Sequence, residues 1–181
     1  TARNFATYPI PAGEVTRDAL FVVSKVYPHN ASRRGTVAAC ERSRQRLGLD
    51  RIDLYLLHWR GQHPLADTVA AMGELQEAGC IARWGVSNLD TADMHELAQV
   101  PGGAGCSVDQ VYYSLSERGI EFALLPWLRG RGIAAMAYCP IDQGALARDA
   151  TLESIGARLG ATAAQVALAW GVAQPGVIAI P

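Results

Sequence analysis

The sequence lacks the marks of several protein classes. It has no uninterrupted apolar run of about 18 residues, so we expect no membrane span. Sixteen Lys and Arg against seventeen Asp and Glu give a net charge of −1, and without a basic excess a nucleic-acid partner is not expected. The four cysteines form no CxxC pair, which argues against a zinc site or a disulfide framework, and no metal ligand set is assigned. No targeting segment is recognised at the start, so we expect a cytoplasmic protein.

Lysine is almost absent. Of the sixteen basic residues only Lys25 is a lysine, and the other fifteen are arginines. A lysine amine can lose its proton when its surroundings shift its pKa, whereas an arginine stays charged. The lone lysine therefore suggests that its position needs an amine.

Apolar runs typical of buried strands alternate with helix-like stretches. The expected strands are 20–26, 52–58, 81–88, 107–113, 133–140 and 177–180. Expected helix caps are Ser32, Asp90, Thr151 and Thr162, and Pro126 is expected to break a helical stretch. Such alternation predicts right-handed βαβ units and a parallel sheet.

The length of 181 residues suits one domain. We expect an irregular lead over residues 1–19 and a single domain over 20–181. No GxGxxG follows the first strand, which disfavours the doubly wound dinucleotide fold. An eight-stranded α/β barrel needs roughly 250 residues, so six strands indicate either a barrel without two of its strands or an open sheet.

Polar side chains stand at or near the ends of five expected strands. Sites in parallel α/β folds are built at the carboxyl ends of strands. The residues are Lys25, His58, Ser87, Asn88, Gln110 and Tyr138. They indicate either one shared site or a set of unrelated strand ends solvated by loops.

Six ordered segments carry a family resemblance that runs from about Leu20 to Pro181. They are SKV around Lys25, LLHW around His58, IARWGVSN, DQVYYSL, AMAYCP, and AAQVALAW with VIAIP. Together they resemble the aldo-keto reductases, above all the bacterial branch that reduces 2-oxoaldehydes such as methylglyoxal. The resemblance implies a (β/α)8 TIM barrel, here incomplete with about six parallel strands, that binds NADP(H) without a Rossmann fold. NAD(H) stays open.

The resemblance also implies catalytic roles. In the family a hydride passes from the nicotinamide to a carbonyl carbon while a Tyr supplies a proton. A neighbouring Lys ammonium lowers the pKa of that Tyr, and a His hydrogen-bonds the carbonyl oxygen. Lys25 matches the lysine and His58 the histidine. Taken singly, Lys25 could instead pair with Asp53, and His58 could be a core histidine.

The cofactor and the substrate have their own expected residues. Tyr138 matches the ring that stacks under the nicotinamide, and its carboxamide would be held by the side chains of Ser87, Asn88 and Gln110. Trp59, beside His58, and Tyr27, on the strand face of Lys25, are expected to line the substrate pocket. The other readings are a packed ring for Tyr138, turn formers for Ser87 and Asn88, and solvated loop positions for the remaining histidines, His29 included.

The sequence also departs from the family pattern. No Asp-Thr-Ala segment precedes Lys25, so Tyr8 and Tyr27 are only weak candidates for the proton donor. The family's phosphate-holding segment, which follows VIAIP, is not in the chain. Asp109 stands where the family has Asn, which would place a charge near the carboxamide site.

Two functions are therefore expected as alternatives. The first is an NADPH-dependent oxidoreductase that reduces small aldehydes and 2-oxoaldehydes to alcohols. The second is a catalytically silent nicotinamide-binding or scaffold module. The partner is a small carbonyl compound, and open barrel edges would favour self-association.

Overall fold

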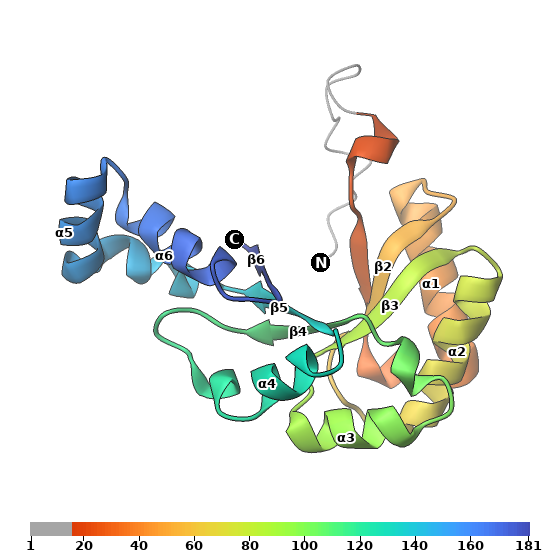
Figure 1. Ribbon diagram of the computed structural model, residues 1–181. Helices are drawn as coiled ribbons and strands as arrows, with labels where there is room; N and C mark the ends of the chain where they lie inside the picture. The colour runs from red at the N-terminus through yellow and green to blue at the C-terminus, as the bar shows by residue number, and fades with distance from the viewer. Residues whose placement is uncertain (1–15) are drawn as a thin grey trace. The chain divides into compact units, whose positions relative to one another are not determined.

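The computed structural model describes residues 16–181, and these fall into two compact units (Figure 1). Unit 1 comprises residues 16–87 and 94–106, and unit 2 comprises residues 88–93 and 107–181. Most of the expected irregular lead, Tyr8 included, lies outside the described residues. The described part begins with a short 3-10 turn, η2 (Arg17–Ala19).

Unit 1 is built on three parallel strands, β1 (Val23–Val26), β2 (Ile52–Leu57) and β3 (Ile81–Ser87). All six residues of β2 are buried, as expected for an apolar strand with a neighbour on each side and helices over it. The register sets Lys25 opposite Leu56 and Val26 opposite Leu57. It therefore brings the carboxyl ends of β1 and β2 to the same level.

The helices of unit 1 begin and end where the local chemistry directs. In Figure 1, α1 (Arg33–Leu47) and α2 (Leu65–Glu77) lie together beside the strands of this unit. Ser32 caps α1 by accepting the N–H of Gly35 at 3.1 Å, as predicted, and Gly48 ends it in a left-handed conformation. The helix α3 (Thr91–Gln99) has residues 91–93 in unit 2 and the rest in unit 1, and it starts at the predicted cap, because Asp90 Oδ1 accepts the N–H of Asp93 at 2.8 Å.

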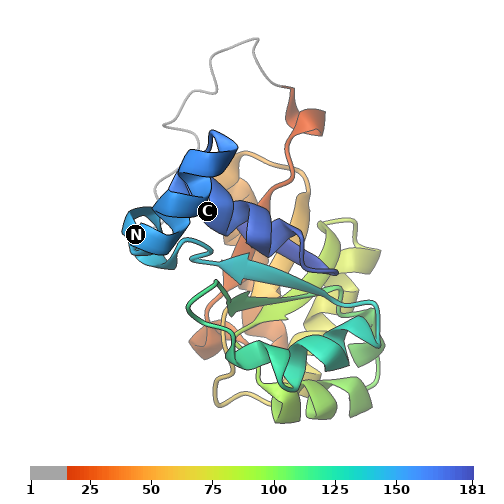
Figure 2. The same ribbon diagram turned by 60° about the vertical axis from the view of Figure 1, so that its left-hand side comes forward.

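Unit 2 repeats the pattern with β4 (Val108–Tyr112), β5 (Ala134–Tyr138) and β6 (Val177–Ile180), which pair in parallel in chain order. Its helices are α4 (Leu124–Arg129), α5 (Ala150–Leu159) and α6 (Ala163–Val172). Figure 2 shows α5 and α6 side by side. Their contact is made by a small apolar cluster that includes Leu152, Ala163 and Ala167.

Two local predictions in unit 2 are wrong. Asp149, not Thr151, caps α5, because its carboxylate accepts the N–H of Leu152 at 2.9 Å and the helix starts earlier. Pro126 does not break α4 but lies in its first turn, where a backbone N–H has no partner to lose. The cap at Thr162 is confirmed, and it forms a full capping box with Gln165.

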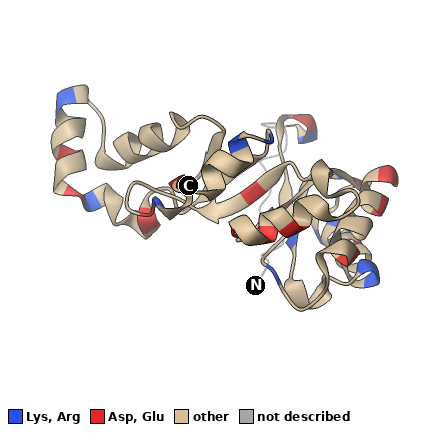
Figure 3. Cartoon of the chain, turned by 60° about the horizontal axis from the view of Figure 1, so that its bottom comes forward, with Lys and Arg blue, Asp and Glu red and all other residues tan. Residues whose placement is uncertain are grey.

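The charges and the helices add two observations. In each unit Lys and Arg are interspersed with Asp and Glu rather than gathered into a basic stripe (Figure 3). Between residues 16 and 181, no helix combines the length and the apolar character needed to cross a membrane.

Candidate active site

Lys25 and His58 lie at the carboxyl ends of neighbouring strands in unit 1. Lys25 is near the end of β1, and the backbone N–H of His58, just past β2, donates to the Val26 carbonyl at 3.0 Å. Burial lowers the pKa of the Lys25 amine. Burial also lowers the pKa of His58, and the positive charge of Lys25 lowers it further. The two side chains therefore interact electrostatically at one edge of the unit 1 sheet.

Four rings of unit 1 form what we call the aromatic cluster: Tyr27, His29, His58 and Trp59. The His58 and Trp59 rings are 4.5 Å apart, and the Tyr27 ring lies 5.1 Å from His58 and 5.4 Å from Trp59. Tyr27 is 48% exposed and Trp59 is 42% exposed. Unit 1 thus brings both expected pocket residues to the expected histidine and leaves apolar surface open beside them.

His29 joins this cluster although the sequence suggested a solvated position. Its ring stacks on Tyr27 at 5.5 Å, with 16° between the planes. The signal that could have found it is the two-residue spacing from Tyr27 across Pro28, at the start of the short turn η3 (Pro28–Asn30). His29 is therefore part of the aromatic cluster through its stacking contact with the partly exposed ring of Tyr27.

The loops after β1 and β2 pack closely at one glycine. A Cβ atom at Gly61 would lie 2.5 Å from the Cβ of Pro28, closer than two carbon atoms approach without repulsion. Only glycine fits this contact unchanged. The contact holds together the loops that carry Tyr27 and Trp59.

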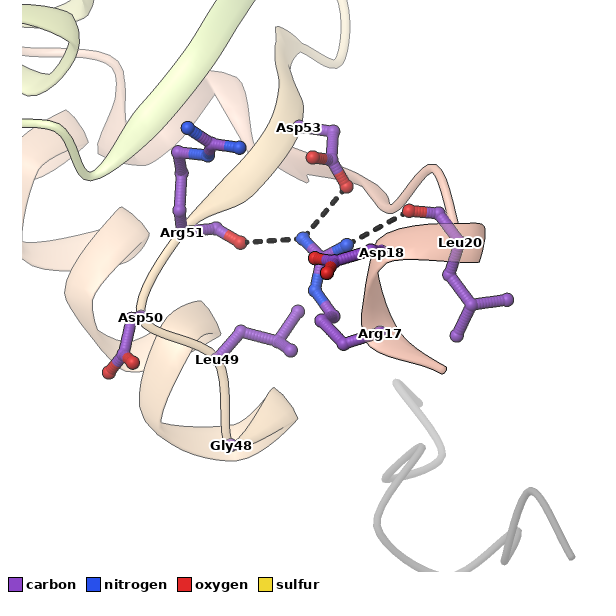
Figure 4. Close-up of a pocket in the computed structure, with 8 residues that line it drawn as sticks. All are labelled: Arg17, Asp18, Leu20, Gly48, Leu49, Asp50, Arg51 and Asp53. Carbon is purple, nitrogen blue, oxygen red and sulfur yellow. Dashed lines mark hydrogen bonds and ion pairs between the residues drawn. The ribbon is translucent and has the colours of Figure 1, made fainter. Parts of the chain in front are cut away.

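A polar hollow of about 380 Å³ lies at the start of β2, a different part of unit 1 from Lys25 (Figure 4). Here Arg17 donates to Asp53 at 2.8 Å and to the carbonyls of Leu20 and Arg51, each at 2.9 Å. Burial alone would raise the pKa of Asp53, but the Val22 N–H and the Arg17 guanidinium outweigh it and lower that pKa. Asp53, the alternative partner of Lys25, is thus held by Arg17 in a structural contact.

Unit 2 brings together Asn88, Gln110 and Tyr138. The Tyr138 hydroxyl donates to Asn88 Oδ1 at 2.8 Å, and the Asn88 backbone N–H donates to the Gln110 carbonyl at 2.9 Å. The Gln110 amide donates to the Met136 sulfur at 3.0 Å, a weak acceptor. Ser87 ends β3 in unit 1, fully buried, and is joined to Asn88 by the peptide bond. Three of the four expected cofactor residues therefore share one compact unit.

The turn after β5 is conformationally unusual. Four non-glycine residues between positions 16 and 181 have positive φ: Asn88 at 58°, and Cys139, Asp142 and Gln143 at 53°, 49° and 51°. Cys139 follows Tyr138 directly, Asp142 and Gln143 lie in the same turn, and Asn88 is the hydrogen-bond partner of Tyr138. Left-handed backbone at non-glycine residues is costly and gathers at functional sites. This clustering supports a functional role for the surroundings of Tyr138.

Sequence reasoning missed Tyr112 and Asp142. Tyr112 ends β4, and its hydroxyl donates to an Asp142 carboxylate oxygen. Its ring is parallel to that of Tyr138, with 5.4 Å between centroids. The signal available in the sequence was the pair of tyrosines that end two consecutive strands.

Asp109 is fully buried in β4. Among residues 16–181, no donor meets both the distance and the angle of a hydrogen bond to either of its carboxyl oxygens. Burial raises its pKa to about 7, the charge of Asp93 adds to the rise, and the nearby Leu89 N–H only partly opposes it. Alternation places its side chain on the face of β4 opposite to Gln110. Below pH 7 the expected charge next to Gln110 is therefore largely neutralised.

No three His, Cys, Asp or Glu side chains among residues 16–181 gather closely enough to hold a metal ion. Unit 1 holds an amine, an imidazole and aromatic rings, and unit 2 holds amides and paired tyrosines. Each of these groups can hydrogen-bond or stack on an organic molecule.

Comparisons with known proteins identify the family. A sequence model of the aldo/keto reductase family matches residues 5–181. The chain belongs to the aldo/keto reductase family. A methylglyoxal reductase of Escherichia coli, YeaE, is 49% identical over 170 residues, and a glyoxal reductase of Bacillus subtilis is 36% identical over 167 residues. The matches cover 91% and 92% of this chain, but 60% and 59% of those proteins.

A solved structure agrees with this membership. The aldo/keto reductase of Klebsiella pneumoniae, crystallised with NADP and acetate, superimposes with a TM-score of 0.88 at 46% identity. The match covers 91% of this chain and 60% of that chain. The predicted fold class is confirmed: this aldo/keto reductase chain has the α/β fold of the (β/α)8 barrel, as an incomplete barrel with six parallel strands. The chain spans about three fifths of the length of the relatives it matches.

Proposed function

We propose that this aldo/keto reductase chain carries the carbonyl-reducing site of an NADPH-dependent oxidoreductase that acts on small aldehydes and 2-oxoaldehydes. The observation that carries the proposal is the placement of Lys25 and His58 at adjacent strand ends, within electrostatic reach of each other. The methylglyoxal and glyoxal reductase activities named for two relatives support the substrate class.

The residues of unit 1 suit a developing oxyanion. A carbonyl oxygen gains negative charge as its carbon is reduced, and positioned donors near that oxygen stabilise the charge. In this proposal the Lys25 ammonium supplies positive charge and the His58 ring a hydrogen bond. The lowered pKa of His58 keeps its imidazole neutral near pH 7, and a neutral ring can still donate through one nitrogen. Tyr27 and Trp59 would hold the carbon skeleton of a small aldehyde against the aromatic cluster.

The residues of unit 2 fit a nicotinamide. The Tyr138 ring is partly exposed, its hydroxyl donates to the Asn88 side chain, and the Asn88 backbone N–H donates to the Gln110 carbonyl. In this proposal Tyr138 stacks on the nicotinamide, and Ser87, Asn88 and Gln110 hold its carboxamide. When bound, the cofactor supplies the hydride. The NADP in the Klebsiella structure supports NADP(H) as the cofactor, and NAD(H) is tested beside it.

A second function is favoured by one specific observation. Asn88, Gln110 and Tyr138 belong to one compact unit, and Lys25 and His58 belong to the other. The hydrogen bonds described above among Asn88, Gln110 and Tyr138 lie within unit 2. A chain that binds the cofactor without reducing a carbonyl would fit this arrangement.

The test is to mix the purified chain with NADPH or NADH and methylglyoxal, and to follow absorbance at the nicotinamide wavelength. The matched variants are Lys25→Met, which removes the charge, and Arg60→Met, which removes from the same unit a partly buried charge that is paired with Glu96. Turnover that falls at least tenfold in Lys25→Met but not in Arg60→Met supports the reductase. Binding of NADPH, measured by its fluorescence, without turnover in any variant supports the binding module. Neither binding nor turnover contradicts both.

Self-association through open strand edges remains a prediction of the sequence. Size-exclusion chromatography with light scattering tests it over a range of concentrations. A mass of 19.3 kDa at every concentration would contradict it.

A further inference from the structure

Tyr112 and Tyr138 form a matched pair at the ends of neighbouring strands. The register of β4 and β5 sets them directly opposite each other. Their rings are nearly parallel, with 6° between the planes and 5.4 Å between the centroids. This separation lies within the range of favourable offset stacking. Each ring therefore limits the rotation of the other.

Tyr112 is fixed at its far end as well. Its hydroxyl donates to Asp142 Oδ1, and the second carboxylate oxygen of Asp142 accepts from Ser116 Oγ at 2.9 Å. The bonds from Tyr112 and Ser116 hold the pKa of Asp142 below its usual range, so the carboxylate stays charged. A charged acceptor makes a stronger hydrogen bond than a neutral one. The ring of Tyr112 is thus held by its stack and by its hydroxyl.

The same contacts argue against Tyr112 as a proton donor. The bond to Asp142, with burial as a smaller cause, raises the pKa of Tyr112 to about 12. A phenol with that pKa releases its proton less readily than a free tyrosine does, and its hydrogen already points at Asp142. The geometry leaves a positional role for this ring.

Asp142 connects this pair to the turn that follows Tyr138. Cys139, Asp142 and Gln143 all have positive φ, a costly backbone conformation for these residues, and the bond from Tyr112 to Asp142 is one of the contacts that hold this turn. Tyr138 is therefore restrained on three sides: by the Tyr112 ring, by the hydrogen bond from its hydroxyl to Asn88, and by the turn to which Tyr112 is bound.

We propose that Tyr112 is a positioning residue, which holds the Tyr138 ring in the orientation that stacks on the nicotinamide and does not itself react. This inference rests on the proposed function, because it takes Tyr138 as the stacking ring. It adds to that function a residue in β4 and its carboxylate anchor, Asp142, as parts of the cofactor site.

The test compares three variants. Tyr112→Leu removes the ring, Tyr112→Phe keeps the ring but removes the hydroxyl, and Tyr113→Phe is the matched control. Tyr113 is the next residue, and its hydroxyl also donates to a carboxylate, Glu121 at 2.7 Å. The control therefore loses the same kind of bond, and it keeps the hydrogen bond from the Tyr113 backbone N–H to the Tyr138 carbonyl, at 3.5 Å. Thermal unfolding of each variant shows whether it is folded.

The first readout needs no cofactor. With ¹³C-labelled tyrosine, the ring signals of Tyr138 are assigned by their loss in Tyr138→Phe. We expect these signals to shift in Tyr112→Leu, because the neighbouring ring current is lost, and to stay near their wild-type positions in Tyr112→Phe and Tyr113→Phe. Unchanged Tyr138 signals in Tyr112→Leu would overturn the proposal.

The second readout is the Kd for NADPH, measured by fluorescence titration. We expect it to rise about tenfold in Tyr112→Leu, about threefold or less in Tyr112→Phe, and not at all in Tyr113→Phe. An unchanged or lower Kd in Tyr112→Leu would overturn the proposal, and a lower one would mean that the Tyr112 ring competes with the nicotinamide.

Two further outcomes of the test also bear on the proposal. If Tyr112→Leu does not fold, Asp142→Asn replaces it: this change weakens the anchor, and Tyr138 signals that neither shift nor broaden would overturn the proposal. If the wild-type chain binds no NADPH, the proposed function fails separately, a positioning role toward a nicotinamide falls with it, and the ring signals still decide whether Tyr112 restrains Tyr138.

Discussion

The Tyr138 hydroxyl donates a 2.8 Å hydrogen bond to the side-chain oxygen of Asn88, whose backbone is left-handed at φ 58°. The side chain of Asn88 accepts a hydrogen bond, and its backbone adopts a left-handed conformation. Two substitutions distinguish the effects of these two features. Glycine adopts positive φ without steric cost, whereas alanine does not.

We expect Asn88→Gly and Asn88→Ala to lose the same hydrogen bond from Tyr138 and to weaken NADPH binding by a similar factor of about three to ten. Asn88→Ala should in addition be less stable than Asn88→Gly by roughly 1 kcal/mol, because of its left-handed backbone. Thermal unfolding and fluorescence titration measure the two effects. Equal stability of the two variants would show that the conformation at residue 88 is not maintained in solution.

Asp109 should make stability depend on pH. Its pKa is about 7 in the folded chain, above the value near 3.9 of an unfolded one. The folded chain therefore keeps a proton that the unfolded chain has lost, and stability falls as pH rises from about 4 to about 7. The difference in pKa corresponds to roughly 4 kcal/mol at most. Above pH 7 this contribution no longer changes.

Asp109→Asn is the matching variant, because an amide keeps the shape and cannot ionise. We expect its urea unfolding free energy to vary less with pH between 4 and 7 than that of the wild type, and to exceed it at pH 8. Asp93→Asn removes the like charge that acts on Asp109, so it should move the wild-type transition to lower pH. A wild-type profile that is flat over this interval and matches that of Asp109→Asn would mean that Asp109 is ionised in the folded chain.

Lys25 should control the ionisation of His58. Burial is the main cause of the lowered His58 pKa, and the Lys25 charge is the second. We therefore expect Lys25→Met to raise the pKa of His58 part of the way to its ordinary value, and Lys25→Arg to leave it low. NMR titration of the imidazole C–H signals measures both, with His58→Gln to assign the signal. If the pKa of His58 is unchanged in Lys25→Met, the Lys25 amine and the His58 ring are farther apart in solution than in the structure.

Much of the fold could be predicted because the decisive signals are local. Ser32, Asp90 and Thr162 cap helices through bonds to residues three positions ahead, and strands such as Ile52–Leu57 are marked by continuous apolar runs. Thr151 was wrongly preferred to Asp149 because both residues are good caps, and the choice depends on where α5 packs against the rest of unit 2.

The candidate site was predictable only in part. The polar ends of strands indicated Lys25, His58 and Tyr138, since a parallel sheet aligns those ends. Tyr112 and Asp142 were missed, because their roles depend on the register of β4 with β5 and on a turn whose positive φ values fall on residues other than glycine. Two tyrosines that end consecutive strands were a signal for the ring pair, but the bond from Tyr112 to Asp142 joins residues 30 positions apart and depends on the fold.

Gly61 gives a test of how the aromatic cluster is held together. Because Gly61 has no Cβ, Pro28 can pack directly against its backbone. The Cβ of an alanine at this position would lie only 2.5 Å from the Cβ of Pro28. Neither loop can yield without moving Tyr27 or Trp59. We expect Gly61→Ala to lower stability by about 1–3 kcal/mol, in the range of overpacked sites, and to reduce the quenching of Trp59 fluorescence by its neighbours. Trp59→Phe identifies the Trp59 share of the signal.

The control is Gly73→Ala within α2, where an added Cβ would meet no atom within 4 Å. A glycine inside a helix is less favourable than alanine by roughly 0.5–1 kcal/mol, so this variant should be more stable than the wild type. Opposite signs for the two Gly→Ala changes, measured by thermal unfolding, would assign the loss at Gly61 to its contact with Pro28. A gain in stability at both positions would show that the loops after β1 and β2 are not packed against each other in solution.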